Sequence, residues 1–224
     1  MTAFALDPLD LAALLCSRVC HDVISPVGAV VNGLEMLEEE KDPAMREEVL
    51  GLIRASAENA SARLQFSRLA FGAAGSAGAS IDTGDAEKVL RGLLSDPKLR
   101  IDWRVPRALA PKNRVKLTLN LCLVAAAAIP RGGEILVESE GDMSADGLVL
   151  RVGARGPNAK LAPHVAAILS GAPREAIDAH AIQPHYAALV AASAGLALAV
   201  ETAQDAVTIE ARRAAGENPA TAAA

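Results

Sequence analysis

The chain has 224 residues, of which 51% are apolar, and this content excludes a disordered protein and suffices for one large or two small domains. Because only 2% of the residues are aromatic, the core must consist of small and aliphatic side chains, which suits closely packed helices. The formal net charge of -5, without a long basic run, argues against a nucleic-acid partner and against an acidic membrane surface.

Two segments, residues 1–10 and 119–129, bear on whether the protein is secreted or embedded in a membrane, and neither predicts it. The first ten residues contain no basic residue and no long apolar stretch, and residues 119–129 are too few for a span that needs roughly 20 residues. The three cysteines, Cys16, Cys20 and Cys122, cannot all pair within one chain and match no common zinc pattern. We therefore expect reduced thiols that act as small core residues, in a cytoplasmic protein.

Two long helices are predicted first. Asp7-Pro8 and Asp42-Pro43 each place a capping carboxylate before a proline at the first helical position. An apolar stripe with spacings of three and four follows each start signal, as in packed amphipathic helices. The first stripe consists of Leu9, Ala13, Cys16, Cys20, Val23, Val27, Val30, Leu34 and Leu37. The second consists of Met45, Val49, Ile53, Ala57, Ala60, Leu64 and Phe71.

A short connection makes these two helices an antiparallel hairpin, but a single hairpin leaves its stripes in water. Two hairpins bury the stripes by forming a four-helix bundle across a two-fold axis, so we expect a homodimer. The alternative is that the carboxy-terminal half folds back over the hairpin.

Residues 72–80 are glycine, alanine and serine, which predicts a flexible linker between two domains. We therefore divide the chain into a hairpin domain at 1–74, a second domain at 80–213 and a disordered tail at 214–224. In the second domain, the patterns predict helices at 85–94, 112–129, 162–169 and 184–194. Strands are expected at 100–105, 134–139, 148–152, 197–201 and 206–211. This order predicts an α+β fold with helices on one face of a mostly antiparallel sheet.

The segment that carries chemistry is His21-Asp22-Val23-Ile24-Ser25-Pro26, within the first helix. Proline inside a helix costs about 3 kcal/mol, removes the donor for the Asp22 carbonyl and bends the helix beside His21. His21 follows the core residue Cys20, so its ring should lie on the flank of the bundle. A carboxylate that accepts a proton from one ring nitrogen leaves the other nitrogen free to attack. From these residues alone, an ordinary surface pair is the simpler interpretation.

This segment, with Gly28, Asn32, Gly33 and Leu34 after it, resembles the phosphoacceptor box of two-component histidine kinases. It departs from the box in Ser25, where threonine or asparagine is common, and in Ile24, where a basic residue is common. The resemblance implies that the hairpin is a dimerisation and phosphoacceptor domain and that His21 is phosphorylated. Asp22 would orient the ring or assist proton transfer, and Ser25 is a further catalytic candidate.

The second half is similar to the ATP-binding α/β sandwich of the same kinases, but its nucleotide chemistry is missing. Val124 stands where an asparagine holds magnesium, and Ala154 stands where an aspartate contacts adenine. Residues 183–186, of sequence QPHY, replace the glycine-rich lid. Asn120 is then expected on the helix surface or in a supporting role. The remaining histidines, His164, His180 and His185, are expected to be ordinary surface or helix-end residues.

Loss of ATP binding with retention of the histidine box resembles the ChpT-type histidine phosphotransferases, over essentially the whole chain up to Arg213. The resemblance implies that His21 takes phosphate from the receiver domain of a hybrid sensor kinase (CckA-like). Response-regulator receivers (CtrA-like and CpdR-like) would then accept it on an aspartate, in a cell-cycle phosphorelay. Magnesium would be held by the receiver, and this chain would bind no cofactor or metal.

Receiver contacts are expected from exposed residues near the histidine, namely Arg18, Ile24, Asn32 and Arg68. Two other functions remain open from the sequence. One is an active ATP-dependent histidine kinase, and the other is a non-catalytic adaptor that only binds receivers.

Overall fold

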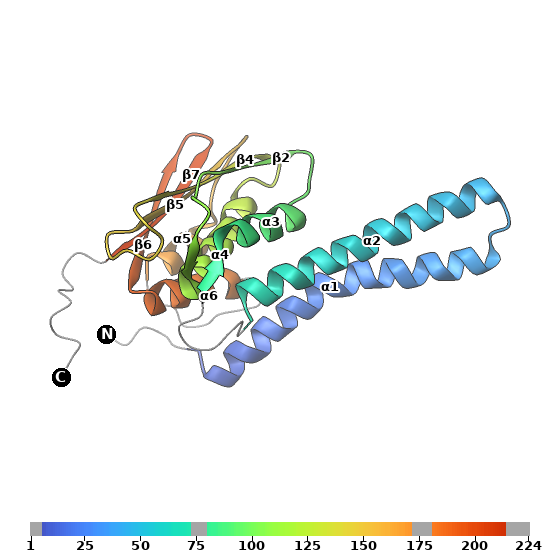
Figure 1. Ribbon diagram of the computed structural model, residues 1–224, viewed down its shortest axis with the longest axis horizontal. Helices are drawn as coiled ribbons and strands as arrows, with labels where there is room; N and C mark the ends of the chain where they lie inside the picture. Colours follow the sequence, from blue (N-terminus) through green and yellow to red (C-terminus); the bar gives the residue numbers. More distant parts are fainter. Residues whose placement is uncertain (1–5, 73–79, 172–180, 214–224) are drawn as a thin grey trace.

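The computed structural model describes residues 6–72, 80–171 and 181–213. Its first two elements are the helices α1 (Pro8–Glu39) and α2 (Pro43–Ala70), which form the predicted antiparallel hairpin. Both predicted start signals are confirmed, because the Asp7 carboxylate accepts from the Leu9 N–H at 2.8 Å and Asp42 accepts from the Ala44 N–H at 3.0 Å. Figure 1 shows the hairpin as a long arm that projects from the sheet-bearing part of the molecule.

The rest of the described chain forms a five-stranded sheet covered by four helices, so the expected α+β class is confirmed. The strand order is β2 (Leu99–Trp103), β4 (Gly133–Glu140), β5 (Val149–Arg155), β7 (Ala206–Arg213) and β6 (Leu196–Ala203). β2 runs parallel to β4, and the other neighbours are antiparallel. The helices are α3 (Thr83–Leu93), α4 (Lys112–Ala128), α5 (Pro163–Leu169) and α6 (Ile182–Ser193).

A second, two-stranded sheet was not predicted from the sequence. It joins β1 (Ser80–Asp82) to β3 (Leu109–Pro111), with Ile81 opposite Ala110. Strands of three residues carry too few positions to show a periodicity. The expected linker and tail lie in residues 73–79 and 214–224, outside the described residues, so the division into domains stays a prediction.

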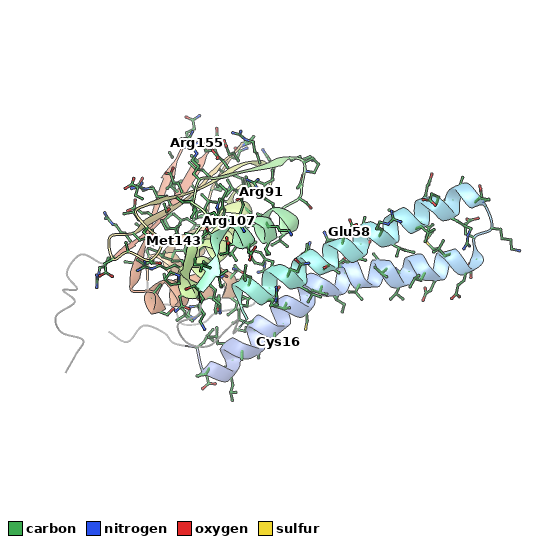
Figure 2. All side chains as sticks on the ribbon, viewed as in Figure 1. Cys16, Glu58, Arg91, Arg107, Met143 and Arg155 are labelled. Atoms are coloured by element: carbon green, nitrogen blue, oxygen red, sulfur yellow. The ribbon has the colours of Figure 1, made fainter. Side chains whose placement is uncertain are left out.

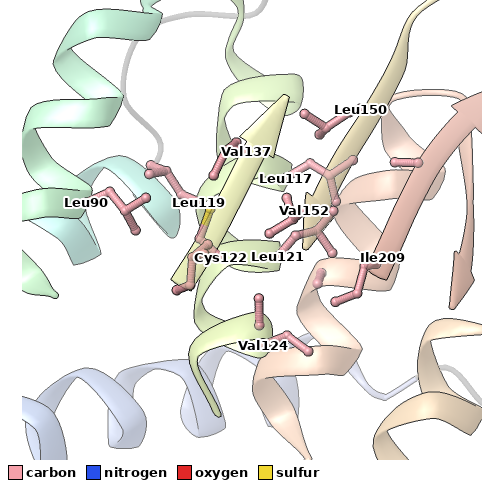
Figure 3. Packing of buried hydrophobic residues seen from close by; sticks show 14 of the residues in the cluster. Leu90, Leu117, Leu119, Leu121, Cys122, Val124, Val137, Leu150, Val152 and Ile209 are labelled. Atoms are coloured by element: carbon pink, nitrogen blue, oxygen red, sulfur yellow. The ribbon is translucent and has the colours of Figure 1, made fainter. Parts of the chain in front are cut away.

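The two sheets and helices α3 to α6 are called the sheet domain below. Its core is built around α4, which is buried on nearly every side. Leu117 and Leu121 of this helix pack against Val152 of β5 and Ile209 of β7 (Figure 3). The inward residues of β5, such as Val152, are buried, whereas the alternate residues are partly exposed. The sheet therefore has one apolar face toward the helices and one face toward solvent, as alternation with a period of two requires.

The base of the hairpin is anchored in this same core. Phe66 and Ala70 of α2 belong to the buried cluster, and Phe71 packs edge-to-face against Tyr186 of α6 with ring centroids 5.5 Å apart. The Asn120 amide of α4 donates to the Ala70 carbonyl at 3.2 Å. The last carbonyl groups of α2, which lack helical partners, are thus bonded by a side chain from the sheet domain.

Most of the hairpin extends beyond this anchor and away from the sheet domain (Figure 2). Its large exposed apolar side chains are Leu9, Ile24, Val27, Val31, Leu34, Met36, Met45, Leu50, Leu52 and Leu64. Contact with the sheet domain therefore covers only the base of the hairpin, and the alternative in which the carboxy-terminal half covers the stripes is wrong for the described residues.

One helix of the described chain, α1, has the length and composition of a membrane span, with a mean hydropathy of 1.4 over its most apolar window. Length and composition are weak indicators for a single helix, because the helices of soluble bundles pass the same test. One side of α1 lies along α2, and the Arg18–Asp22 ion pair lies in its middle.

Replacement of Asn120 by alanine should destabilise the protein by about 1–3 kcal/mol, because it leaves buried polar groups of α2 and α6 without partners. Urea unfolding followed by circular dichroism measures the effect. Asn113→Ala is the matched control, since this amide lies near the start of the same helix and bonds the exposed Ser193 hydroxyl. Equal effects of the two substitutions would contradict the anchoring role of Asn120.

Candidate functional site

His21 lies in the middle of α1 with its side chain 86% exposed. The ring approaches its neighbour through one edge, because Nδ1 is 3.8 Å from the Asp22 Oδ1 atom. The other carboxylate oxygen of Asp22 accepts from the Arg18 Nε–H at 3.0 Å, one helical turn earlier. The predicted solvent-open position of the imidazole is therefore present, with a carboxylate that a cation holds in place.

Pro26 lies inside α1, four residues after Asp22. It has no N–H to donate to the Asp22 carbonyl, and α1 changes direction about halfway along its length (Figure 1). The bend gives the helix segment that carries His21 and the segment after Pro26 different directions.

A groove of about 520 Å³ runs between α1 and α2 beside the histidine. From α1 it is lined by His21, Asp22, Ser25, Pro26 and Ala29. From α2 it is lined by Leu52, Ala55, Ser56, Asn59 and Arg63. The structure thus brings all three predicted catalytic residues, His21, Asp22 and Ser25, to one groove, and it adds a row of α2 residues that the sequence interpretation did not include.

The four residues expected to contact a receiver are not equivalent in the structure. Ile24 is 71% exposed one turn after His21, and Asn32 and Arg68 are also exposed. Arg18 differs, since only 30% of its side chain is exposed and its guanidinium pairs with Asp22. Arg18 is therefore half-buried rather than exposed as expected, and its contact with a receiver stays a prediction.

The positions expected to have lost nucleotide contacts lie in the core. Val124 and Ala154 are both buried, and their apolar side chains belong to the central cluster. Neither side chain offers an oxygen ligand for magnesium or an acceptor for an adenine amino group. Within the described ranges, no group of three or more His, Cys, Asp or Glu side chains is placed to hold a metal ion.

Two polar residues near these positions are buried. Asn120 is not on the helix surface, and of its two expected places the supporting role agrees with the structure, because its Oδ1 accepts from the Gln183 amide at 2.5 Å. His185 is also buried rather than on the surface, and its Nε2 has no hydrogen-bond partner among the described residues. Apolar neighbours in sequence give no sign of such burial, because it arises where α4, α6 and the end of α2 meet. His164 is exposed as expected, and His180 lies outside the described residues.

The thiols are free, as expected, but only one of them is a core residue. Cys122 is fully buried, and burial raises the pKa of its thiol above its usual range. Cys16 and Cys20 are exposed on α1 in the single chain, so their core position stays a prediction that requires a second molecule to cover them.

Residues 83–206 match the family model of the histidine phosphotransferase C-terminal domain. The protein phosphotransferase ChpT of Brucella abortus (strain 2308) is 50% identical over 204 residues, which cover 90% of this chain and 95% of that protein. The chain belongs to the ChpT-type histidine phosphotransferases. A solved bacterial phosphotransferase structure superposes with a TM-score of 0.83 at 44% identity, over 95% of this chain and 100% of that one. The fold and the phosphotransferase activity expected from the sequence are confirmed for this histidine phosphotransferase.

The buried His185 makes the stability of the phosphotransferase depend on pH. Burial lowers the pKa of His185 below its ordinary value of 6.5, so the unfolded chain takes up a proton that the folded chain resists. The contribution of neutral His185 to the free energy of unfolding is therefore fully present above pH 6.5, and it is lost as the pH falls from there toward the lowered pKa. Urea midpoints at pH 7.5 and 5.5 should differ less in His185→Leu than in the unsubstituted protein.

His164→Gln serves as the control, because this histidine is exposed. Its pH dependence should equal that of the unsubstituted protein. A pH dependence of His185→Leu that matches the control would show that another group titrates.

Proposed function

We propose that His21 accepts and donates the phosphoryl group in a multistep phosphorelay, with Asp22 as its orienting acid. The observation that carries this proposal is the 86% exposed ring, whose Nδ1 edge approaches a carboxylate that Arg18 holds. Among the four histidines of the chain, His21 combines this exposure with the box-like neighbours Asp22 and Pro26.

The geometry favours Nε2 as the attacking atom, because Nδ1 faces Asp22. The Nε2 lone pair forms the P–N bond while the P–O bond to the donor aspartate breaks, and that electron pair leaves with the aspartate carboxylate. The Nδ1 proton, acidified by the positive charge on the ring, is shared with or passed to Asp22. Transfer to the next aspartate is the reverse of these steps. Ser25 lines the same groove and can offer its hydroxyl to a phosphoryl oxygen.

The partners in this proposal are receiver domains. The donor is the receiver of a hybrid sensor kinase (CckA-like), and the acceptors are response-regulator receivers (CtrA-like and CpdR-like). The acidic pocket of the receiver supplies the magnesium ion that neutralises phosphoryl charge, and Ile24, Asn32 and Arg68 are exposed for contact. The proposed site for these proteins is the groove side of the hairpin.

The phosphotransferase is also proposed to work without ATP. Val124 and Ala154 are apolar and buried at the two positions where related kinases contact magnesium and adenine. Restoring either contact would require a polar side chain within a filled core, which carries a desolvation cost.

A homodimer is proposed from the exposed apolar residues of α1. The positions Leu9, Cys16, Cys20, Ile24, Val27, Val31 and Leu34 recur at heptad-like spacing and face away from α2. The predicted stripe also included Val23, Val30 and Leu37, which are half-buried rather than exposed. A second hairpin covers the exposed positions as a four-helix bundle, and burial of α1 against protein rather than lipid fits a cytoplasmic location.

Replacement of His21 by alanine should abolish labelling by a phosphorylated receiver, because the accepting nitrogen is gone, while the fold and oligomeric state persist. The label on the unsubstituted protein should be lost in acid, as expected for a phosphohistidine. ATP and magnesium without a receiver should leave the protein unlabelled. Labelling by ATP alone would identify a kinase, and labelling of the His21→Ala variant would place the phosphate elsewhere.

The double substitution Val27→Glu/Leu34→Glu should convert the dimer into a monomer, because it places four carboxylates in the proposed bundle interface. Light scattering coupled to size exclusion reports the molar mass. Leu109→Glu is the control, since this side chain is 70% exposed on β3, in the sheet domain. A monomeric unsubstituted protein, or a double variant that stays dimeric, would refute the interface.

A further inference from the structure

We infer that Arg63 of α2 binds the phosphoryl group on His21 and is the cationic partner of the phosphorylated state. This inference rests on the proposed function, in which His21 carries the phosphate. It assigns a role to a residue of the groove that lies 42 positions away in the sequence.

Arg63 lies nearly level with His21 across the hairpin. Gly33 packs so closely on α2 that an added Cβ would be 2.5 Å from Ile53 Cγ1, which fixes how the two helices align. His21 precedes Gly33 by twelve residues, and Gln65 follows Ile53 by twelve. Since both helices rise by the same amount per residue, Arg63 lies about 3 Å from the level of His21 along the axis.

Arg63 also lies on the side of α2 that faces the groove containing His21. Leu52, Ser56, Asn59 and Arg63 recur at spacings of four, three and four and line the groove that contains His21. Arg63 further lines a second cleft, of about 150 Å³, together with Arg18 and Asp22. Arg63 and Asp22 thus both line the groove and the second cleft.

The charges around the groove leave Arg63 without a carboxylate. Arg18 is paired with Asp22, whereas the Arg63 Nε donates at 2.6 Å to the neutral Asn59 amide oxygen. None of the ion pairs within residues 6–72, 80–171 and 181–213 includes Arg63. Asn59 therefore uses only the Nε donor of the Arg63 guanidinium. The N–H groups of the two terminal nitrogens of Arg63 remain available to another acceptor.

Phosphorylation supplies that acceptor. A phosphoryl group brings a charge near -2 and three strong acceptor oxygens, which Asp22 alone would repel. A planar guanidinium binds two such oxygens at once, and the same contact stabilises charge on these oxygens while phosphorus passes between nitrogen and aspartate. Arg63 therefore acts on the transferring group itself, from the same chain that carries the histidine.

The test is a ³¹P NMR titration of the phosphorylated protein, full-length and without a receiver. Phosphoramidate serves as the small phosphoryl donor, and the His21→Ala variant identifies any signal from other histidines. A contacting guanidinium favours the dianion, so it lowers the pKa of the phosphoryl group. In Arg63→Gln the phosphoryl pKa should rise by about one pH unit, and Arg63→Lys should lie between the two.

Arg54→Gln is the matched control, because this arginine is also on α2 and exposed but does not line the groove. Its phosphoryl titration should equal that of the unsubstituted protein. Transfer from a phosphorylated receiver should slow at least about tenfold in Arg63→Gln and remain unchanged in Arg54→Gln.

An unchanged phosphoryl pKa in Arg63→Gln overturns the inference. If transfer nevertheless slows in that variant, Arg63 contacts the receiver rather than the phosphoryl group. A different result would contradict the proposed function itself: the unsubstituted protein would then give no ³¹P signal that disappears in His21→Ala.

Discussion

The close approach of α1 and α2 at Gly33 is the contact on which the arrangement of the hairpin depends. With a glycine at this point, Ile53 occupies the space that a side chain of α1 would need. Helical periodicity then decides which residues of α1 meet α2 and which meet solvent. The same periodicity places His21 at one groove of the hairpin and most of the exposed apolar stripe on another side, and Ile24, one turn after His21, is common to the two proposed contact surfaces.

The interior of the sheet domain serves packing. Val124 and Ala154 complete an apolar core, and Asn120 bonds the backbone of α2 and the side chain of Gln183. The Asn120 amide therefore joins α4 to both α2 and α6. Its partners explain why a polar side chain is fully buried in the middle of α4.

Much of this structure could be predicted from local sequence. Asp7-Pro8 and Asp42-Pro43 located both helix starts, because a capping carboxylate and a following proline act within one turn. The likeness of the His21 segment to a phosphoacceptor box could be recognised because the box lies within six consecutive residues, and the role of His21 is a proposal. The burial of Asn120 and His185 could not be predicted with the same success, because it depends on contacts between segments up to 63 residues apart. The Arg18–Asp22 pair is local, since the two residues lie one turn apart on α1, and its spacing of four could have been used to predict it. Arg63 belongs with Asn120 and His185, since only the register of the hairpin relates it to the histidine.

The bonding of the end of α2 by α4 has a consequence for mutations far from the histidine. Lys116 and Asn120 direct their donors to the Phe71 and Ala70 carbonyls, so the folded sheet domain stabilises the terminal turn of the arm. Local opening of α4 would therefore also release the end of α2. A substitution that opens this part of the sheet domain would loosen the base of the arm that carries His21.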